Sequence, residues 1–345
     1  MISKILKGVS IFLVWFLILE LGSRIALHLK INLPIANPHK LLTEVIYPEV
    51  GYVKSNYKLG REHFNILLLG GSVINHRWSN LEKKLRENVQ SYTNLQVNVY
   101  NLSMPGHNSL DNLIKYEILQ DLEFDAVVYY ESINETRANN IDSSYFKKDY
   151  SHISWYRNIY LLNKHPELKL TVIPFFIEYV IDRIRIKFNK ERYILSALPK
   201  LKKFDRVSPL GSVKTLKTNL SEINRIAKNK GEPLLLCTYA FYVPENVNLT
   251  GSKKDKKFYS ACSLSSPITN WGSVNNTLKS LKLHNKVIHS IALENPNVIL
   301  YDFNKVLDIN KGYFCDICHM TPLGNNVLSN GISEKIIELI LNKIS

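Results

Sequence analysis

The chain has 345 residues, of which 45% are apolar and 21% charged, and this composition is ordinary for a folded protein. It excludes a disordered tail protein, a collagen-like fibre and a polytopic transporter, and the length allows one large domain or two modest ones. The 44 Lys and Arg residues against 30 Asp and Glu give a formal net charge of +14. Such a surplus suits an anionic partner, namely nucleic acid, anionic lipid or acidic glycan, or is simply a basic surface.

The N-terminal region contains an apolar run. Residues 8–19 carry no charge, and the run can be extended into a helix of about 30 Å, which matches the hydrocarbon thickness of a bilayer. Glu20 and Arg24 fall near the end of this helix, four residues apart, where they can neutralise each other or reach the interface. We predict one membrane-anchoring helix over 8–28, within an anchor segment 1–30.

A cleaved signal peptide is the alternative interpretation of this run, although no convincing small-residue cleavage site follows it. Lys4 and Lys7 precede the run with the terminal amine, and Arg24 and Lys30 follow it. We expect a single-pass membrane protein with the N-terminus inside and the bulk of the chain outside the cytoplasm. The prolines beyond the run predict a linker over 31–62.

Five short apolar runs, each bounded by turn residues, alternate with helical patterns in the rest of the chain. Most of the runs are hydrophobic throughout, as expected of parallel strands that are buried on both faces. This alternation predicts a three-layer α/β/α fold with a central parallel sheet of about five strands. The predicted strands are 65–69, 97–100, 126–130, 234–238 and 298–302, and the predicted helices are 81–90, 110–122, 213–230 and 278–294.

An oversized connection at 136–212 separates the third and fourth predicted strands. It is rich in aromatic and basic residues, and 182–206 holds nine Lys or Arg against three acidic residues. One interpretation is a cap over the ligand-binding edge of the sheet, or a surface that touches lipid or an acidic polymer. The alternative is a helical insertion that packs on the core and exposes a basic face to water.

Two short segments carry candidate catalytic side chains. Ser72 follows two glycines directly after the first strand, at the carboxyl edge of the sheet where open α/β folds bind ligands. Near the C-terminus, Asp316 precedes His319 by three residues, so its carboxylate can hold one ring nitrogen while the other faces a hydroxyl. Each segment alone is ambiguous, because both can equally be ordinary turns.

Two further segments follow the second and third strands. The first ends in Gly106, and the second runs from Glu131 to Glu135 and contains Asn134. The backbone N–H groups of Ser72 and Gly106 and the Asn134 amide could form an oxyanion hole. Asn134 at the end of a buried strand is otherwise a simple turn residue.

These four segments resemble the four blocks of the SGNH hydrolases, also called the GDSL esterase/lipase superfamily. The resemblance covers residues 63–345, and the Asp-x-x-His pair followed by Thr-Pro-x-Gly-Asn is its most specific part. The chain departs from the family pattern at Gly71, where the family has aspartate, at Ser132, where it has glycine, and at Glu135, where it has aspartate. These departures remove no catalytic group, although they leave rate and substrate open.

The resemblance implies a flavodoxin-like SGNH fold and a serine hydrolase that acts on ester bonds without a metal or another cofactor. Ser72 would attack the acyl carbon, His319 would act as general base and acid, and Asp316 would orient His319. Ser72, Gly106 and Asn134 would bind the oxyanion.

The leading functional hypothesis is a membrane-anchored serine esterase that removes acyl groups, acetyl above all, from a glycan or lipid. An acyltransferase of the same fold that modifies a cell-envelope polysaccharide is the alternative, since water and a sugar hydroxyl compete for the same acyl-enzyme. A non-catalytic scaffold that binds an envelope polymer is a third hypothesis, and nucleic acid is not expected as a partner because no recognisable module is present. The oligomeric state stays open.

The four cysteines are too few for a disulfide scaffold in a chain of this length. Cys315 and Cys318 have the C-x-x-C spacing, but no second ligand pair accompanies them, as a zinc site would require. We expect them to pack beside the loop that carries the histidine, with a disulfide there as the alternative. Cys237 is expected in the core, and His284 at the surface or in a packing position.

Overall fold

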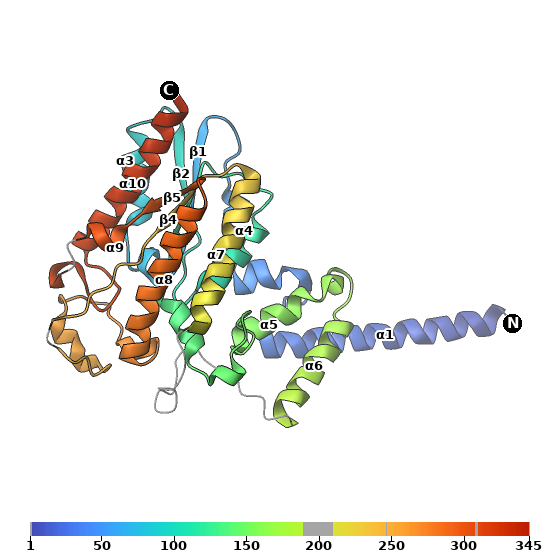
Figure 1. Cartoon of the computed structure of the whole chain (residues 1–345). Helices are drawn as coiled ribbons and strands as arrows, with labels where there is room; N and C mark the ends of the chain where they lie inside the picture. The colour runs from blue at the N-terminus through green and yellow to red at the C-terminus, as the bar shows by residue number, and fades with distance from the viewer. Residues whose placement is uncertain (1, 189–209, 246, 308–309, 345) are drawn as a thin grey trace. The chain divides into compact units, whose positions relative to one another are not determined.

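The computed structural model of the chain forms two compact units (Figure 1). Unit 1 comprises Met1–Tyr52 and Ser151–Leu195, and unit 2 comprises Val53–Tyr150 and Ser196–Ser345. The residues that the structure describes are 2–188, 210–245, 247–307 and 310–344.

Unit 2 is built on one sheet of five parallel strands in the order β2-β1-β3-β4-β5. This is the flavodoxin-like order of doubly wound folds, in which a ligand site forms where the strand order reverses beside the first strand. The predicted fold class is therefore confirmed. The strands are β1 (His63–Gly70), β2 (Gln96–Asn101), β3 (Ala126–Tyr130), β4 (Leu234–Cys237) and β5 (Val298–Tyr301).

Strand β1 is an interior strand of the sheet and pairs with β2 on one side and with β3 on the other. Ile66 pairs with Val99 of β2, and Gly70 pairs with Tyr130 of β3. Ile66 and the three leucines that follow it are fully buried, because helices cover both faces of a parallel sheet. This explains why the strand is hydrophobic at successive positions and not only at alternate ones.

The helices of unit 2 cover both faces of this sheet. They are α3 (Leu81–Gln90), α4 (Ser109–Ile118), α7 (Leu210–Lys230), α8 (Val274–Glu294), α9 (Phe303–Val306) and α10 (Pro322–Ile344). Helices α3 and α10 pack together on one face, and α4, α7 and α8 form the layer on the other (Figure 1). All the strands and helices predicted from the sequence are present, with ends that differ by a few residues.

Helix α4 starts directly after the second sequence block, and its first turn is capped. The Asn108 side chain accepts hydrogen bonds from the N–H groups of Leu110 and Asp111, and the Asp111 side chain accepts one from the N–H of Asn108 at 2.9 Å. This reciprocal capping box satisfies N–H groups that the helix itself leaves free. It fixes the chain just behind Gly106, whose φ of +86° lies in the left-handed region that favours glycine.

Helix α1 of unit 1 is long and apolar enough to cross a membrane. A window within Ser3–Ile31 has a mean hydropathy of 2.0 and is not buried. Its side chains are exposed on all sides as far as Leu19, whereas Glu20, Ser23 and Leu27 are buried on one face. A signal sequence would meet the same criteria of length and hydropathy, so α1 is a candidate span.

The buried end of α1 belongs to the small core of unit 1. The Glu20 carboxylate accepts hydrogen bonds from the Thr171 hydroxyl at 2.6 Å and from the Val172 N–H at 3.1 Å. The helices that start in this unit are α1 (Ile2–Ile31), α2 (Pro48–Asn56), α5 (Ser154–Asn163) and α6 (Ile173–Phe188). The buried core residues are Leu27, Leu33, Leu41, Leu161, Leu162, Leu168, Val172 and Phe175.

The long connection at 136–212 is described only in part. Helices α5 and α6 lie in its described part and belong to unit 1 with the N-terminal segment. The basic stretch 182–206 continues into 189–209, which is outside the described residues. The domain boundaries expected from the sequence stay a prediction, and they are 1–30, 31–62 and 63–345.

Candidate active site

Ser72 lies just after the carboxyl end of strand β1. Strand β1 stops at Gly70, Gly71 follows in an extended conformation, and a short helical turn starts at Ser72. A Cβ atom on Gly71 would lie only 2.8 Å from the Asn134 amide nitrogen and 2.9 Å from the Cγ of Glu131. A side chain at position 71 would therefore require the Asn134 and Glu131 side chains to shift, and glycine avoids this.

Three of the predicted residues form one chain of hydrogen bonds. The Ser72 Oγ lies 2.8 Å from the Nε2 of His319, and the His319 Nδ1 lies 2.8 Å from the Oδ2 of Asp316. All three side chains are buried, with the Ser72 residue 6% exposed. The carboxylate faces Nδ1, so that ring nitrogen carries the proton and Nε2 is left to accept the serine proton.

The Asp316 carboxylate has a full set of donors. Its Oδ1 accepts the N–H groups of Cys318 at 3.0 Å and of His319 at 2.8 Å, and its Oδ2 also accepts the N–H of Ser266 at 2.6 Å. Burial acts to raise the pKa of Asp316, but the electrostatic interaction with His319 and the hydrogen bonds from His319 and Cys318 outweigh it and lower the pKa. The carboxyl group is therefore ionised and oriented.

The Asn134 side chain is held on both sides. Its Nδ2 donates a hydrogen bond to the carbonyl of His107 at 2.9 Å, and its Oδ1 accepts one from the indole N–H of Trp271 at 3.0 Å. The amide thus lies between the loop of the first block, where it touches Gly71, and the loop of the second block. An amide nitrogen has two N–H bonds, and His107 uses one of them.

Gly106 lies in the loop that Asn134 contacts. A Cβ atom on Gly106 would lie 3.0 Å from the Arg137 guanidinium, so this position also has a close neighbour. Convergence of its N–H with those of Ser72 and Asn134 on one oxyanion stays a prediction.

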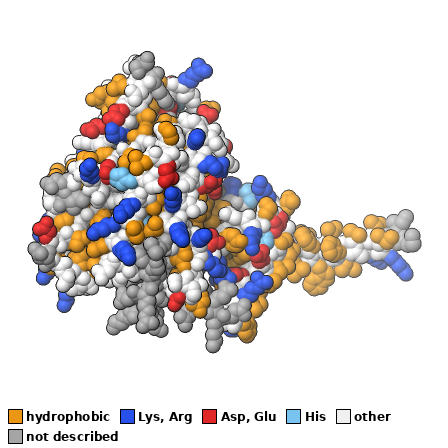
Figure 2. Space-filling view, in the orientation of Figure 1, with side chains coloured by type: hydrophobic (Ala, Val, Ile, Leu, Met, Phe, Trp, Pro, Cys, Tyr) orange, Lys and Arg blue, Asp and Glu red, His pale blue; other side chains and the backbone are white. Residues whose placement is uncertain are grey.

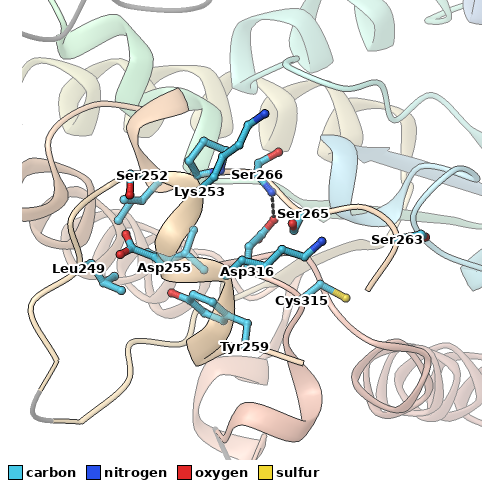
Figure 3. A pocket seen from close by; sticks show the side chains of 14 residues that line it. Leu249, Ser252, Lys253, Asp255, Tyr259, Ser263, Ser265, Ser266, Cys315 and Asp316 are labelled. Atoms are coloured by element: carbon cyan, nitrogen blue, oxygen red, sulfur yellow. Dashed lines mark hydrogen bonds between the residues drawn. The ribbon is translucent and has the colours of Figure 1, made fainter. Parts of the chain in front are cut away.

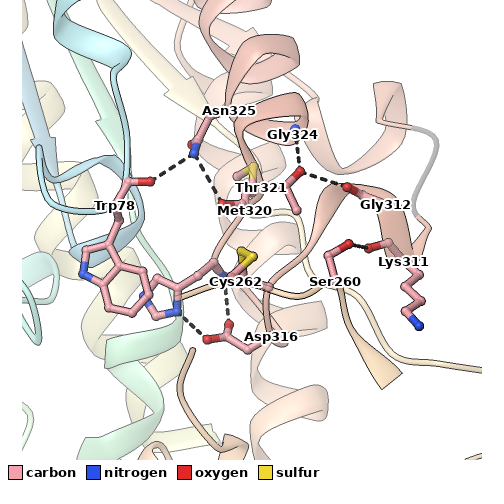
Figure 4. The surroundings of a disulfide bond; sticks show 12 residues. Trp78, Ser260, Cys262, Lys311, Gly312, Asp316, Met320, Thr321, Gly324 and Asn325 are labelled. Carbon is pink, nitrogen blue, oxygen red and sulfur yellow. Dashed lines mark hydrogen bonds and ion pairs between the residues drawn. A yellow bond between two sulfur atoms is a disulfide. The ribbon is translucent and has the colours of Figure 1, made fainter. Parts of the chain in front are cut away.

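Two indole rings surround the histidine, and the sequence analysis missed both. Trp78 stacks on the His319 ring with 3.7 Å between centroids and 18° between planes, and Trp271 lies at 6.0 Å. The Trp78 carbonyl accepts a hydrogen bond from the Asn325 side chain at 3.0 Å (Figure 4). No spacing signal exists for Trp78 or Trp271, because a lone tryptophan in a loop has no periodic pattern.

A disulfide joins Cys315 to Cys262, and it corrects the sequence-based alternative of a bridge within the C-x-x-C pair (Figure 4). Cys318 is free and buried, and so is Cys237, as expected of a core residue. Burial, together with the nearby Asp316 charge, raises the pKa of the Cys318 thiol well above its usual value. Cys318 is therefore a protonated packing residue beside the site.

Asp316, Cys318 and His319 offer ligand atoms within 4.8 Å of one another, which is the spacing of a metal site. The Nδ1 of His319 already donates to Asp316, however, and the Cys318 thiol keeps its proton. To bind zinc through these three residues, Cys318 would have to be a thiolate and the His319 Nδ1 would have to be free. The arrangement suits a proton-transfer chain better than a cation.

A cavity of about 230 Å³ adjoins the carboxylate side of this chain (Figure 3). Asp316, Ser266 and Tyr259 line it, and the Ser266 N–H reaches Asp316 at its wall. Ser72 and His319 do not line it, so it is not the place where an acyl group would meet the serine.

Buried acids lie behind the third block. Glu135 is fully buried, and it accepts hydrogen bonds from the Ser109 N–H at 2.5 Å and from the Tyr150 hydroxyl. Burial raises the pKa of Glu135 to about 7, and the nearby Asp111 adds to the rise. Glu131 is also buried, and burial with the neighbouring Glu135 charge raises its pKa well above the usual value.

His284 is a structural residue of the same region. It bridges the hydroxyl groups of Ser132 at 3.0 Å and Ser212 at 2.9 Å, and it is fully buried. Burial lowers its pKa to about 3, so the ring is neutral. The packing role was expected from the sequence, and the surface position was not correct.

Comparison with known proteins finds similar folds but no match by sequence. No protein-family model and no curated protein matches the chain. The similar solved structures include a lipase/acylhydrolase from Enterococcus faecalis (15% identity, 80% of this chain and 96% of that chain, TM-score 0.42). A GDSL-like lipase from Bacteroides thetaiotaomicron (13%, 84% and 97%, 0.42) and a member of the lipolytic G-D-S-L family from Veillonella parvula (12%, 79% and 97%, 0.39) are others.

These similar structures belong to the class that the four sequence blocks resemble. Because the identities are low and the TM-scores lie below 0.5, the likeness carries none of the functional argument. That argument rests on the geometry of this chain's own residues.

The buried Glu135 predicts a specific pH dependence of stability. Its pKa is raised from 4.5 to about 7 on folding, so the native state holds a proton that the unfolded chain has lost. The resulting stabilisation is fully present below pH 4.5 and is lost as the pH rises through about 7. We expect Glu135→Gln to lower the slope of unfolding free energy against pH across this window, measured by urea denaturation.

The exposed Glu338→Gln in α10 serves as the control, since its carboxyl group is at the surface. If Glu135→Gln and Glu338→Gln give parallel curves, the Glu135 carboxyl group does not titrate as its burial requires.

Proposed function

We propose that the protein is a serine esterase in which Ser72, His319 and Asp316 form the catalytic triad. The carrying observation is the unbroken chain of two hydrogen bonds, each 2.8 Å long, from the Ser72 hydroxyl through the imidazole to the Asp316 carboxylate. A nucleophile, a base within reach of its proton and a third group that orients the base are the parts needed for acyl transfer.

The proposed reaction has two halves. The Ser72 oxygen forms a bond to the acyl carbon while its proton moves to the Nε2 of His319, and the carbonyl oxygen becomes an oxyanion. The oxyanion collapses, the ester C–O bond breaks, and the imidazolium returns the proton to the leaving alcohol. Water then repeats the sequence on the acyl-serine and releases the carboxylic acid. Asp316 stabilises the imidazolium in both halves.

Asn134 is the proposed side-chain donor to the oxyanion. The Trp271 indole N–H fixes the amide oxygen, so the NH₂ end must face the opposite way, toward Gly71 and the His107 carbonyl. We propose that its second N–H points to the Ser72 side, because the Asn134 nitrogen lies against Gly71, the residue before Ser72. A donor fixed before the reaction needs no reorganisation when negative charge develops, which is the source of its catalytic effect.

The chemical class proposed for the substrate is an ester of a short acyl group, acetyl first, on a glycan or lipid. Ser72 is 6% exposed, and two indole rings flank the His319 that serves it, which favours a small acyl group. The formal charge of +14 favours an anionic carrier such as an acidic glycan or a membrane surface.

The proposed location is the outer side of a membrane, with α1 as a retained anchor. Leu27 and Glu20 of α1 are buried in unit 1, so cleavage of α1 as a signal peptide would remove core residues. The Cys262–Cys315 disulfide supports an oxidising compartment.

The first test of the triad is Ser72→Ala. We expect it to lower kcat/KM for an aryl acetate by at least about 10³-fold with unchanged thermal unfolding, since the nucleophile is lost and the fold is not. Ser103→Ala is the matched control, because Ser103 is another buried serine near the same sheet edge and its hydroxyl has no hydrogen-bond partner among the described residues. Equal rates for Ser72→Ala and the parent would reject the assignment.

Asn134→Ala tests the oxyanion hole. We expect kcat to fall by about 10²–10³ with little change in KM, because the oxyanion exists only after attack. Asn134→Asp should be at least as damaging, since an ionised carboxylate would face the developing charge. Glu135→Gln is the control, because Glu135 is bound to Ser109 and Tyr150. If Asn134→Ala turns over the ester at the parent rate, Asn134 is an ordinary turn residue.

The anchor is tested by extraction of membranes. Full-length protein should stay with the membrane pellet in alkaline carbonate, because a spanning helix is released only by detergent. Release of the intact chain by carbonate, or a mature N-terminus downstream of α1, would show a peripheral or processed protein.

A further inference from the structure

Helix α6 carries an apolar stripe that the structure leaves exposed. Its members recur at positions three and four apart, so they lie along one face of the helix. Their exposed fractions run from 37% to 73%, which is far above the usual burial of large apolar side chains. They are Ile177, Val180, Ile181, Ile184 and Phe188.

Asp182 and Arg183 of α6 face α5 of the same unit. Asp182 accepts a hydrogen bond from Arg157 of α5 at 2.6 Å, and Arg183 donates one to Asn158 of α5 at 2.6 Å. These contacts fix the rotation of α6 about its axis. The stripe therefore faces away from α5, while Phe175 on the other side of α6 packs into the core of unit 1. A helix on a water-soluble domain would expose mainly polar side chains on its outer face.

Hydrogen bonds join the segment just before α6 to Glu20 of α1, and this contact fixes the position along α1 at which α6 begins. Thr171 and Val172, just before α6, donate to the Glu20 carboxylate of α1. Glu20 is also the first residue of α1 with a packed side, after the segment exposed all round. Figure 1 shows α6 crossing α1 steeply at this point, and the two helices are in contact.

The length of the freely exposed part of α1 places this level in the membrane. Residues 5–19 are about 22 Å long as a helix, whereas the hydrocarbon core is about 30 Å thick. Figure 2 shows hydrophobic side chains along the whole of this exposed shaft. Glu20 and the beginning of α6 then lie at the outer edge of the hydrocarbon layer.

We propose that α6 is an interfacial helix that lies in the outer boundary of the bilayer and inserts its apolar stripe among the lipid acyl chains. Arg185 and Lys187 are exposed next to the stripe, where they can meet anionic headgroups. The proposal rests on the proposed anchoring by α1. In addition to that anchor, α6 would contact the outer leaflet of the same membrane. An anchor alone leaves rotation of unit 1 about the membrane normal and its tilt free, whereas α6 restricts the tilt.

The test uses full-length protein in vesicles of phosphatidylcholine and phosphatidylglycerol, with single nitroxide labels on introduced cysteines. The variants are Ile181→Cys and Ile184→Cys in the stripe, Leu13→Cys in the span and Leu293→Cys as a water-exposed control. Leu293 suits this role because it is a large apolar residue, 84% exposed on α8. The native Cys237 and Cys318 are buried and the other two cysteines are paired.

The measured quantity is the ratio of collision rates with oxygen and with a water-soluble nickel chelate. We expect this ratio at Ile181→Cys and Ile184→Cys to be several-fold higher than at Leu293→Cys and lower than at Leu13→Cys. A ratio equal to that at Leu293→Cys, with Leu13→Cys embedded, overturns the proposal for α6 and leaves the anchor intact.

Two other results also overturn the proposal. If labels in the stripe are immobilised and reached by neither collision partner, protein covers the stripe, either elsewhere in this chain or in a second copy. If Leu13→Cys itself is reached by the nickel chelate, α1 does not span the bilayer, and the anchor fails together with the interfacial helix.

Discussion

The buried negative charge of Asp316 is the constraint on which the candidate site depends. A carboxylate that is 3% exposed must be matched by donors, because an unpaired buried charge costs several kcal/mol. Backbone N–H groups of Cys318, His319 and Ser266 supply that match, together with the imidazole. The segment around Ser266 and the segment 316–319, which are distant in sequence, thus bind to one carboxyl group. These contacts fix the carboxylate, and the carboxylate in turn orients the histidine.

The same principle explains why the histidine has so little freedom. Its ring is bound at both nitrogens, and the Trp78 indole covers one face. The position of Trp78 is in turn fixed by Asn325, which lies in the first turn of α10. Helix α10, the last helix in the sequence, therefore helps to fix the site through Trp78, which lies near the start of unit 2 in the sequence. The Cys262–Cys315 disulfide adds a covalent link beside the carboxylate.

Much of the fold and the core of the site could be predicted from the sequence. Parallel strands buried on both faces produce solid apolar runs, and the polar residues that follow those runs must meet at one edge. Ser72 was predicted in this way, and Asp316 and His319 were predicted from their spacing of three residues. Trp78, Trp271 and the partner of Cys315 were not, because their contacts join segments with no local pattern. The orientation of α6 could not be predicted either, since periodicity shows which residues share a face and not which way that face points.

Gly71 has a consequence for how this chain can change over time. A side chain at this position would collide with both Asn134 and Glu131. The aspartate of the family pattern and the present placement of Glu131 are thus mutually exclusive neighbours. A side chain introduced at position 71 alone would crowd Glu131, and a smaller residue at position 131 alone would leave the site underpacked. Positions 71 and 131 are therefore expected to change together. Among related chains, we expect glycine before the serine to occur together with glutamate directly after the third strand. A motif search that requires aspartate before the serine would miss such chains.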